Sequence, residues 1–495
     1  MSRSIALGAS LSVVDVVRVA RDRASVTLSE AARRRMHSAH AALRARAEAG
    51  ERIYGWTLGV GSLDQARVCA QDNRAFQRNL LRSHAAGVGT PLEADIVRAI
   101  IAIRAHQLAL GRSGVRPALV ESLGALLHRG VVPVVPGVGS VGASDLAPLA
   151  HVGLVLLGEG YARVAGSAVL TGAEALERAG LPPFVFDGRE ALGLINGLAQ
   201  SIASAGLGVV DAHALTESFE CVVALGLVAR QGTPSFLAAS AAELKGHPGL
   251  ADSAARIRAL LGDQARRQGT QREPLASRTA AHVLGALRER VEALQRAVYR
   301  ELNAATDNPT VFADGSFDNN LANSDGTELA QTVDGVCDAL LAAAVASERR
   351  VSLLLAGGRA GLPDFLIHPD APAGLHSGLM GAQITAAACV AEMRTWVGAT
   401  GQSVPTVSNF EDYVSMSALA GRRLRRFVQL SRFVLAAEVL AVAQAVDLGS
   451  VSVPPPLLPA YQAIRSRVPT IVEDVPVGEA LSNVDALLRQ PLPTA

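Results

Sequence analysis

A GxGxxG pattern at residues 137–142 is the first arrangement in the sequence that could do chemistry. It follows an apolar run, and Glu159 lies about where dinucleotide-binding proteins place the acid that holds the ribose. Pro133 and Pro136, however, would each remove a hydrogen-bond donor from the central strand that such a loop needs. The surrounding chain also lacks alternating strands and helices. These observations argue against a nucleotide site.

The segment continues as GSVGASDLAPLAH, residues 139–151, in which a loop of small residues runs into a helix. Ser144 or Asp145 is the expected N-cap of that helix. Amides of the loop and the positive end of the helix dipole would favour negative charge that develops beside them. Taken alone, a capped glycine loop is more often structural than catalytic.

Composition and charge exclude several other function classes. The 495-residue chain has 46 basic and 45 acidic side chains, so its formal charge of +1 offers no field for nucleic acid or an anionic membrane. His37 and His40 are spaced for one helix face but lack a third ligand, so no metal site is predicted. The four cysteines are scattered, and no secretion signal is evident. We therefore expect a cytoplasmic protein with no nucleic acid or membrane partner.

The elements that must position any site are expected to be helices. Aromatic residues make up only 4% of the chain while alanine, leucine and arginine abound, a mixture that favours helices over sheets. The clearest pattern spans residues 277–302, where apolar residues recur at alternating spacings of three and four. Similar patterns predict long helices at 197–230, 327–355, 377–397 and 413–446, and shorter ones at 29–48, 93–111 and 116–129. The predicted fold class is all-α.

Two regions are expected along the chain. Residues 1–195 are more broken, with short helices separated by glycine-rich and proline-rich connections, and they are predicted to form a smaller, loop-bearing N-terminal region. Residues 196–495 are predicted to form a bundle of long helices followed by a C-terminal tail. The tail begins at VPPPLLP, residues 453–459, where proline ends the last long helix.

Ordered blocks along the chain resemble a known family. The loop at 139–151 is similar to the signature of the histidine and phenylalanine ammonia-lyases, in which an Ala-Ser-Gly tripeptide cyclises and dehydrates to the electrophile methylidene-imidazolone (MIO). Further matches are Tyr54-Gly55 with Gly59 and Gly61, QRNLLRSHAAGVG at 77–89, LING at 194–197, TDNP at 306–309, SERR at 347–350 and EDYVSM at 411–416. The chain is thus identified as a member of this family, most similar to histidine ammonia-lyase.

The resemblance implies an architecture and a reaction. Members are almost wholly helical homotetramers of the fumarase/aspartase-like superfamily, with long helices bundled at the centre and active sites where subunits meet. In the family, MIO captures an electron-rich part of the amino-acid substrate, a base takes the poorly acidic β-proton, and ammonia leaves to give an α,β-unsaturated acid. Removal of that proton is the difficult step.

The resemblance also assigns roles to individual residues. Tyr54, in the N-terminal region with the 139–151 loop, matches the catalytic tyrosine, whose phenol can act as a base if nearby dipoles lower its pKa from about 10. Arg278 matches the arginine that binds the substrate carboxylate, a task suited to its bidentate fork. Asn196 matches the asparagine near the substrate amino group. The structural alternatives are an ordinary salt bridge for Arg278, which is the less favoured interpretation, and a turn position for Asn196.

Three pocket positions match the histidine-specific members. Ser83, His84 and Glu411 stand as they do in those enzymes rather than in the phenylalanine or tyrosine enzymes. A polar, imidazole-like substrate side chain is therefore expected.

The chain departs from the family pattern at three places. The signature reads Gly-Ala-Ser-Gly-Asp-Leu, whereas this chain reads Gly-Ala-Ser-Asp-Leu at 142–146, so that Asp145 directly follows Ser144 and one glycine is absent. MIO would then form autocatalytically from Ala143, Ser144 and Asp145, although its ring closure is a compressed geometry that glycine tolerates best. Leu275 replaces a tyrosine of the catalytic site, and the family's Asn-Phe-His block is unrecognisable in 317–323.

Two functions therefore remain open from sequence. The first is an ammonia-lyase acting on a histidine-like or other polar or aromatic amino acid, with MIO built from the residues above. The second is an MIO-free homologue that keeps the pocket and performs a different elimination, or a binding or partner role. A glycine missing only from the written sequence, with the matured residue in its place, would restore the first.

Overall fold

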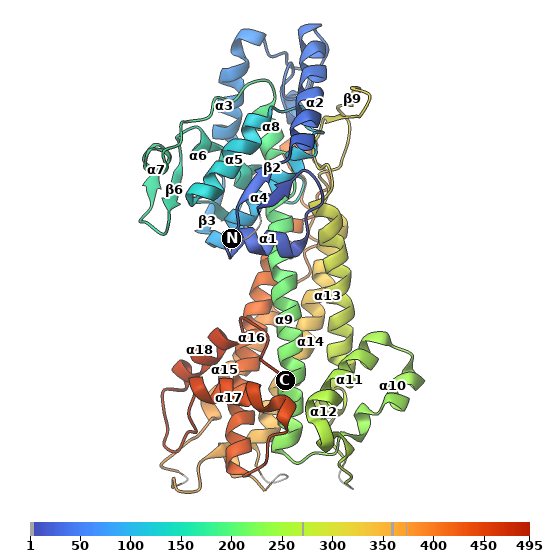
Figure 1. Ribbon diagram of the computed structural model, residues 1–495, viewed down its shortest axis with the longest axis vertical. Coiled ribbons are helices and arrows are strands. Elements are labelled where there is room, and N and C mark those ends of the chain that lie inside the picture. The colour runs from blue at the N-terminus through green and yellow to red at the C-terminus, as the bar shows by residue number, and fades with distance from the viewer. Residues whose placement is uncertain (1–3, 270–271, 358–360, 373) are drawn as a thin grey trace. The chain divides into compact units, whose positions relative to one another are not determined.

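A computed structural model describes residues 4–269, 272–357, 361–372 and 374–495, and most of these residues lie in helices (Figure 1). The chain divides into two compact units. Unit 1 comprises Met1–Leu207, Leu294–Asp334 and Gly398–Arg422, and unit 2 comprises Gly208–Ala293, Gly335–Val397 and Arg423–Ala495. The all-α prediction is confirmed. The division into residues 1–195 and 196–495 stays a prediction. Each compact unit is built from three separate segments of the chain.

The long predicted helices are present with nearly the expected ends. They are α9 (Ala199–Ala229), α13 (Ala280–Leu302), α14 (Thr327–Leu355), α15 (Met380–Arg394) and α16 (Ser417–Leu448). The helix expected from residue 277 is a correction: a separate short helix α12, Leu275–Arg278, precedes Thr279, and α13 begins after it.

Unit 1 contains shorter elements joined by loops, as its glycine and proline content predicts. Its helices are α1 (Val13–Ala20), α2 (Glu30–Glu48), α3 (Asn73–His84), α4 (Ala94–Ala109), α5 (Pro117–Arg129), α6 (Leu146–Leu156), α7 (Gly172–Ala179) and α8 (Glu190–Ile195). Its strands are β1 (Ile5–Leu7), β2 (Val26–Leu28), β3 (Val88–Pro91), β4 (Val131–Pro133), β5 (Pro136–Val138), β6 (Tyr161–Val164), β7 (Leu170–Thr171), β8 (Thr310–Val311) and β9 (Phe317–Asp318).

The strands of unit 1 form small separate sheets. β1 pairs with β2 in parallel, β3 with β5 and β8 with β9 antiparallel, and β4, β6 and β7 make an antiparallel sheet. The GxGxxG segment begins within β5, and the apolar run before it contains β4. These two strands belong to different small sheets. Glu159, the candidate ribose acid, instead accepts hydrogen bonds from Arg82 at 2.9 and 2.7 Å.

The core of unit 1 surrounds α4, which is buried on almost every side. Two of its buried residues are arginines, and each binds the carbonyl end of a neighbouring helix, where the helix dipole favours positive charge. Arg98 donates to Val19 O at 2.8 Å at the end of α1. Arg104 donates to the last carbonyls of α8. The buried charges of α4 thus fix the ends of two helices.

Unit 2 is held by ion pairs between its helices as well as by apolar contacts. Its remaining helices are α10 (Ala239–Lys245), α11 (Pro248–Leu261), α17 (Leu458–Arg467) and α18 (Val477–Leu487). Arg288 on α13 binds Glu220 on α9 at 2.7 and 2.5 Å, and Arg350 on α14 binds Glu438 on α16 at 2.5 and 2.8 Å. The predicted tail after residue 453 forms α17 and α18.

Within the residues that the structure describes, three helical stretches are long and apolar enough, by length and composition, to cross a membrane. In Glu190–Ala229 and Ser417–Leu448 the most apolar stretch is 83% buried within the protein, and in Thr327–Leu355 it is 44% buried. Burial of the first two within the protein accounts for their apolar composition.

Candidate active site

Asn196 lies at the end of α8, in a position set by Arg104. The Arg104 side chain is buried and donates to Leu194 O at 3.0 Å and to Asn196 O at 2.8 Å. Burial lowers the pKa of Arg104 to about 10, so the guanidinium remains protonated at neutral pH. A permanent charge therefore holds the carbonyl of the residue that the sequence places near the substrate amino group.

The side-chain amide of Asn196 has one orientation. Its Nδ2 donates to Asp307 Oδ1 at 3.1 Å and to Asn308 O at 2.9 Å, so its Oδ1 faces the other way and accepts a hydrogen bond from Ser144 Oγ. Asp307 is itself fixed by Arg189, which donates to both carboxylate oxygens at 2.8 and 3.0 Å. Asn196 therefore presents an acceptor toward Ser144.

The loop before α6 is packed tightly against the segment that precedes α16. A Cβ on Gly142, whose φ is +79°, would lie 2.5 Å from Ser417 N. Ser415 Oγ donates to Gly142 O at 2.6 Å, and Met416 N donates to Val141 O at 2.8 Å. Ser144 follows in the left-handed region with φ of +62°. The loop thus has little room to shift.

Asp145 is the N-cap residue of α6, as predicted, but its side chain does not cap that helix. The buried carboxylate instead accepts hydrogen bonds from Ser140 Oγ at 2.6 Å, Ser201 N at 2.8 Å and Ser201 Oγ at 3.1 Å. Ser201 lies in the first turn of α9, so Asp145 satisfies an amide that the helix itself leaves free. Burial raises the pKa of Asp145, and these hydrogen bonds act to lower it.

The loop that carries Tyr54 packs on α8, the helix that ends at Asn196. Gly55 (φ +72°) makes this possible, because a Cβ there would lie 2.1 Å from Leu192 Cδ2. Gln77 of α3 joins the two elements: its Nε2 donates to Gly55 O at 3.1 Å, and its Oε1 accepts from Ala191 N at 2.9 Å. This explains why an amide side chain stands at the start of the QRNLLRSH block.

The Tyr54 hydroxyl accepts a hydrogen bond from Gly61 N at 2.7 Å. This amide lowers the pKa of Tyr54, but burial raises it by more, and the Glu411 carboxylate raises it further. The condition that nearby dipoles lower this pKa below its ordinary value is therefore not met within one chain. The hydroxyl oxygen nevertheless has a donor that would stabilise a phenolate.

Ser83, His84 and Glu411 lie at the margins of the same unit. Ser83 and His84 end α3, where both side chains bond Leu80 O, at 3.1 and 2.9 Å. Burial lowers the pKa of His84. Burial raises the pKa of Glu411, and Asp412 raises it further. Glu411 is near enough to Tyr54 to act on its titration.

Arg278 belongs to unit 2, on α12. Its Nε donates to Glu273 O at 2.8 Å, and the Glu273 carboxylate binds Arg230 at 2.7 Å. Leu275, at the position of a family tyrosine, is 64% exposed. The eight other predicted site residues lie in unit 1. There Ser144 contacts Asn196 directly, Ala143 and Asp145 adjoin Ser144 in the chain, and Tyr54 is tied to α8 through Gln77.

Sequence reasoning missed the residues that hold this site. Asp307 lies in the TDNP block, which assigns it no role of its own, and no motif marks Arg104, Arg189 or Ser201. Arginine in a helix that is otherwise apolar on all sides, as in 94–109, is the signal that could have identified Arg104.

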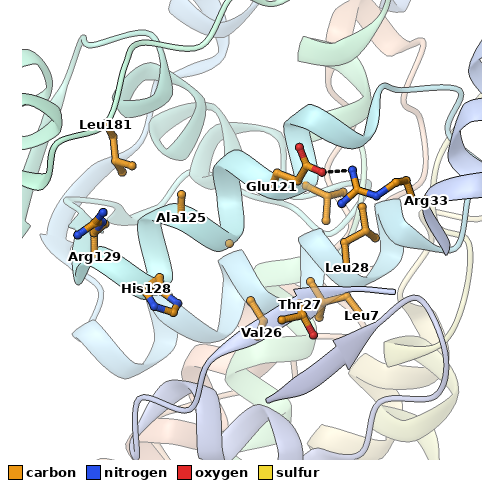
Figure 2. A pocket seen from close by; sticks show the side chains of 12 residues that line it. Leu7, Val26, Thr27, Leu28, Arg33, Glu121, Ala125, His128, Arg129 and Leu181 are labelled. Carbon is orange, nitrogen blue, oxygen red and sulfur yellow. Dashed lines mark hydrogen bonds and ion pairs between the residues drawn. The ribbon is translucent and has the colours of Figure 1, made fainter. Parts of the chain in front are cut away.

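The cavity of about 460 Å³ in Figure 2 lies elsewhere in unit 1. It is lined by residues of β2 and α5, and the Arg33 and Glu121 side chains form an ion pair at its edge. Its lining includes none of the predicted site residues. The catalytic assignment therefore depends on the Ser144 and Asn196 contacts and not on this cavity.

Comparison with known proteins decides the family. A family described as "Aromatic amino acid lyase" matches residues 11–466. The chain belongs to the aromatic amino acid lyase family. It is 40% identical to a histidine ammonia-lyase of Anaeromyxobacter dehalogenans (strain 2CP-C), with 98% of each chain covered, and 38% identical to one of Symbiobacterium thermophilum, with 97% and 96% covered.

Solved structures agree with this family. The chain matches the tyrosine aminomutase of Streptomyces globisporus with a TM-score of 0.92, 34% identity and coverage of 98% and 97%. It matches the histidine ammonia-lyase of Trypanosoma cruzi with a TM-score of 0.91, 30% identity and coverage of 98% and 93%. The chain is therefore an aromatic amino acid lyase in fold as well as in sequence.

MIO is typical of aromatic amino acid lyases, so the fit of this chain to it matters. Closure of the ring consumes the N–H groups of the serine and of the residue after it. Here Ser144 N donates to Ser324 O at 3.2 Å, and Asp145 N donates to Gly197 O at 2.7 Å. Both bonds would be lost, and Asp145 would have to move with its bound carboxylate. The residues present do not fit this group. No group of three or more metal-binding side chains comes together in the described part of the chain.

Proposed function

We propose that the chain is a carbon–nitrogen lyase that removes the amino group of a histidine-like amino acid as ammonia and leaves an α,β-unsaturated acid. The observation that carries this proposal is the match of the aromatic amino acid lyase family to residues 11–466. It is supported by the Tyr54 loop, which Gln77 joins to the helix that ends at Asn196. The 40% identity to a histidine ammonia-lyase supports the choice of leaving group and substrate class.

The chain's own residues supply the groups that elimination needs. Tyr54 is proposed as the base for the β-proton, with the Gly61 amide stabilising its phenolate. Asn196 Oδ1, turned toward Ser144, accepts a hydrogen bond from the substrate ammonium group. Arg278 binds the substrate carboxylate through its planar fork.

Substrate choice is assigned to three polar residues. Ser83, His84 and Glu411 match the histidine-specific members of the family, and Glu411 acts electrostatically on Tyr54. A carboxylate beside the substrate side chain would favour an imidazole over a phenyl ring, since only the imidazole can donate a hydrogen bond to it. We extend the proposal to a cytoplasmic homotetramer with shared active sites, acting on a free amino acid and not on nucleic acid or membrane.

Incubation with L-histidine tests this function. Ultraviolet absorbance of a urocanate-type product should rise with wild-type protein, and L-phenylalanine and L-tyrosine should be turned over more slowly. Asn196→Ala should reduce the rate, whereas Val169→Ala, at an exposed position, serves as the control. Equal rates with all three amino acids would contradict the histidine-like assignment.

A second function is favoured by the Asp145 contacts. An MIO-free homologue that has lost ammonia-lyase activity would keep the pocket and eliminate a better leaving group than ammonia with Tyr54 as base, or bind a ligand or a partner subunit there. The specific support is that Asp145 fills the place of the family glycine with a buried, hydrogen-bonded carboxylate. Absence of any product from histidine, with an unmodified protein mass, would favour this function over the first.

A further inference from the structure

Asp145 joins the signature loop to α9. Its carboxylate accepts hydrogen bonds from Ser201 N at 2.8 Å and Ser201 Oγ at 3.1 Å, and Ser140 Oγ donates to it at 2.6 Å from the other side. Ser201 Oγ in turn accepts from Ser417 Oγ at 2.9 Å. The carboxylate is fully buried, so moving it would expose an uncompensated charge to an apolar interior.

The backbone nitrogen of the same residue would be the nucleophile of ring closure. In that step Asp145 N bonds to the carbonyl carbon of Ala143, and the carbonyl oxygen leaves as water with the hydrogens of Asp145 N and Ser144 N. A second water, from Cα–H and Oγ–H of Ser144, completes the exocyclic double bond. Asp145 N now donates to Gly197 O at 2.7 Å, so ring closure would break this hydrogen bond.

Contacts on both sides of the loop oppose the movement that would bring Asp145 N to the carbonyl carbon of Ala143. Gly142 is seated against Ser415 and Ser417 with no room for even a Cβ. On the other side, the carboxylate of Asp145 is held by Ser201, and this contact opposes a shift of Asp145 toward Ala143. In the family signature a glycine precedes the aspartate, so one residue closes the ring and the next can hold the helix. Here a single residue would have to do both.

We infer that this loop stays an open peptide with an intact Ser144 hydroxyl, and that the missing spacer before Asp145 is the reason. The group so retained is a hydrogen-bond donor bound to Asn196 Oδ1, where the family has an electrophile. The inference does not rest on the proposed substrate. It concerns the covalent state of residues 143–145 and holds or fails whatever the enzyme turns over.

Insertion of one glycine between Ser144 and Asp145 tests the inference. Wild-type protein is expected to show the full mass of its sequence, and the insertion variant that mass less two waters. Mass spectrometry of the proteolytic fragment containing 143–145 locates the change. The same insertion with Ser144→Ala should not form the exocyclic double bond, and a glycine inserted after Gly166, in an open turn, should change nothing but the mass of that glycine.

Two results would overturn the inference: a wild-type chain lighter by two waters, or an insertion variant that folds and keeps its full mass. If the insertion variant is insoluble, Asp145→Gly asks the same question, since it removes both the Cβ and the contact with Ser201; full mass in that variant would also count against the inference. Turnover of histidine is a separate readout. An unmodified wild-type chain that releases ammonia supports the inference and the proposed function alike, and an unmodified inactive chain contradicts only the proposed function.

Discussion

Buried charges serve different ends in the two units. In unit 2, Arg350 binds Glu438 and Arg288 binds Glu220, each arginine reaching a carboxylate on a neighbouring helix. In unit 1, Arg104 binds backbone carbonyls of α8, and Arg189 binds Asp307, which orients Asn196. The first arrangement ties helices together, whereas the second fixes the position and direction of one amide.

The difference separates stability from activity. A charge pair between helix side chains contributes to folding and to the choice of neighbours. A chain of contacts that ends on a single acceptor beside Ser144 also sets geometry at a proposed reaction centre. Substitutions among Arg189, Asp307 and Asn196 should therefore change turnover, and substitutions in the ion pairs between the helices of unit 2 should change mainly stability.

Tyr54→Phe is expected to have the largest effect on turnover. If the phenol is the base, its loss should lower kcat about 10²–10⁴-fold while the protein stays folded. Rates from steady-state assays, with circular dichroism as a check on folding, measure this. Tyr161→Phe, at an exposed tyrosine, is the control and should leave kcat unchanged. A Tyr54→Phe enzyme of normal kcat would exclude the phenol as the base.

The pH dependence follows from the same residue. Burial raises the pKa of Tyr54 above its ordinary value, so the deprotonated form grows with pH across the whole neutral range. We expect kcat/KM of the wild type to rise about tenfold per pH unit there, as for any base whose pKa lies well above the assay pH. A flat profile would mean that contacts beyond those in this chain lower the pKa of Tyr54.

Arg189→Met and Arg350→Met compare the two units directly. Each breaks a buried bidentate ion pair, which costs about 3–5 kcal/mol of unfolding free energy. Asp307 keeps Arg104 at 3.9 Å, so the loss in Arg189→Met should not be the larger of the two. Denaturant unfolding should show similar losses for both. For the molecules that remain folded, kcat should fall more in Arg189→Met than in Arg350→Met, in which the lost contact with Ala276 O concerns only the helix that carries Arg278. Equal kcat losses would mean that the two units do not differ in this way.

Asp307→Asn should give a smaller loss of kcat, although it also removes the charge partner of Arg189 and so lowers stability. The substitution keeps the shape but replaces an acceptor-only group by one that can also donate, so the Asn196 amide is no longer held in one direction. We expect kcat to fall about tenfold, the order of one misdirected hydrogen bond of about 1–2 kcal/mol, with KM little changed. Asp338→Asn, at an exposed carboxylate of unit 2, is the matched control. A change in KM alone would assign Asp307 to substrate binding.

The sequence predicts the helices of both units well and the contacts of unit 1 poorly. Periodic apolar residues place α9, α13, α14 and α16 to within a few residues, because burial of a helix face depends on spacing along the chain. The partner of Asp145 is Ser201, and Arg104 acts on Asn196; both pairs are far apart in sequence and depend on packing. Burial also decides the pKa of Tyr54, which the glycine-rich loop alone did not reveal.

Glu301→Gln should have the smallest effect on the free energy of unfolding. Glu301 lies in unit 1 but outside the contacts that orient the Asn196 amide. Burial raises the pKa of Glu301 to about 7, and the carboxylates of Glu328 and Asp325 raise it while Arg300 lowers it. The folded state thus favours the protonated acid, so the stability that this provides is complete below about pH 4.5 and is lost as the pH rises through 7.

The Glu301→Gln variant cannot ionise, so it should match the wild type near pH 5 and be more stable at pH 8. The difference at pH 8 should be about 1–3 kcal/mol, because each unit of pKa shift corresponds to about 1.4 kcal/mol and partial exposure screens the charge. Denaturant unfolding at the two pH values measures it, with kcat expected to stay the same. Glu328→Gln is the control, because the Glu328 side chain is about half exposed; its unfolding free energy at pH 8 should differ far less from that of the wild type. A Glu301→Gln variant that is less stable than the wild type at pH 8 would show that the ionised carboxylate is stabilised in the fold, and would place this charge with the paired ones of unit 2.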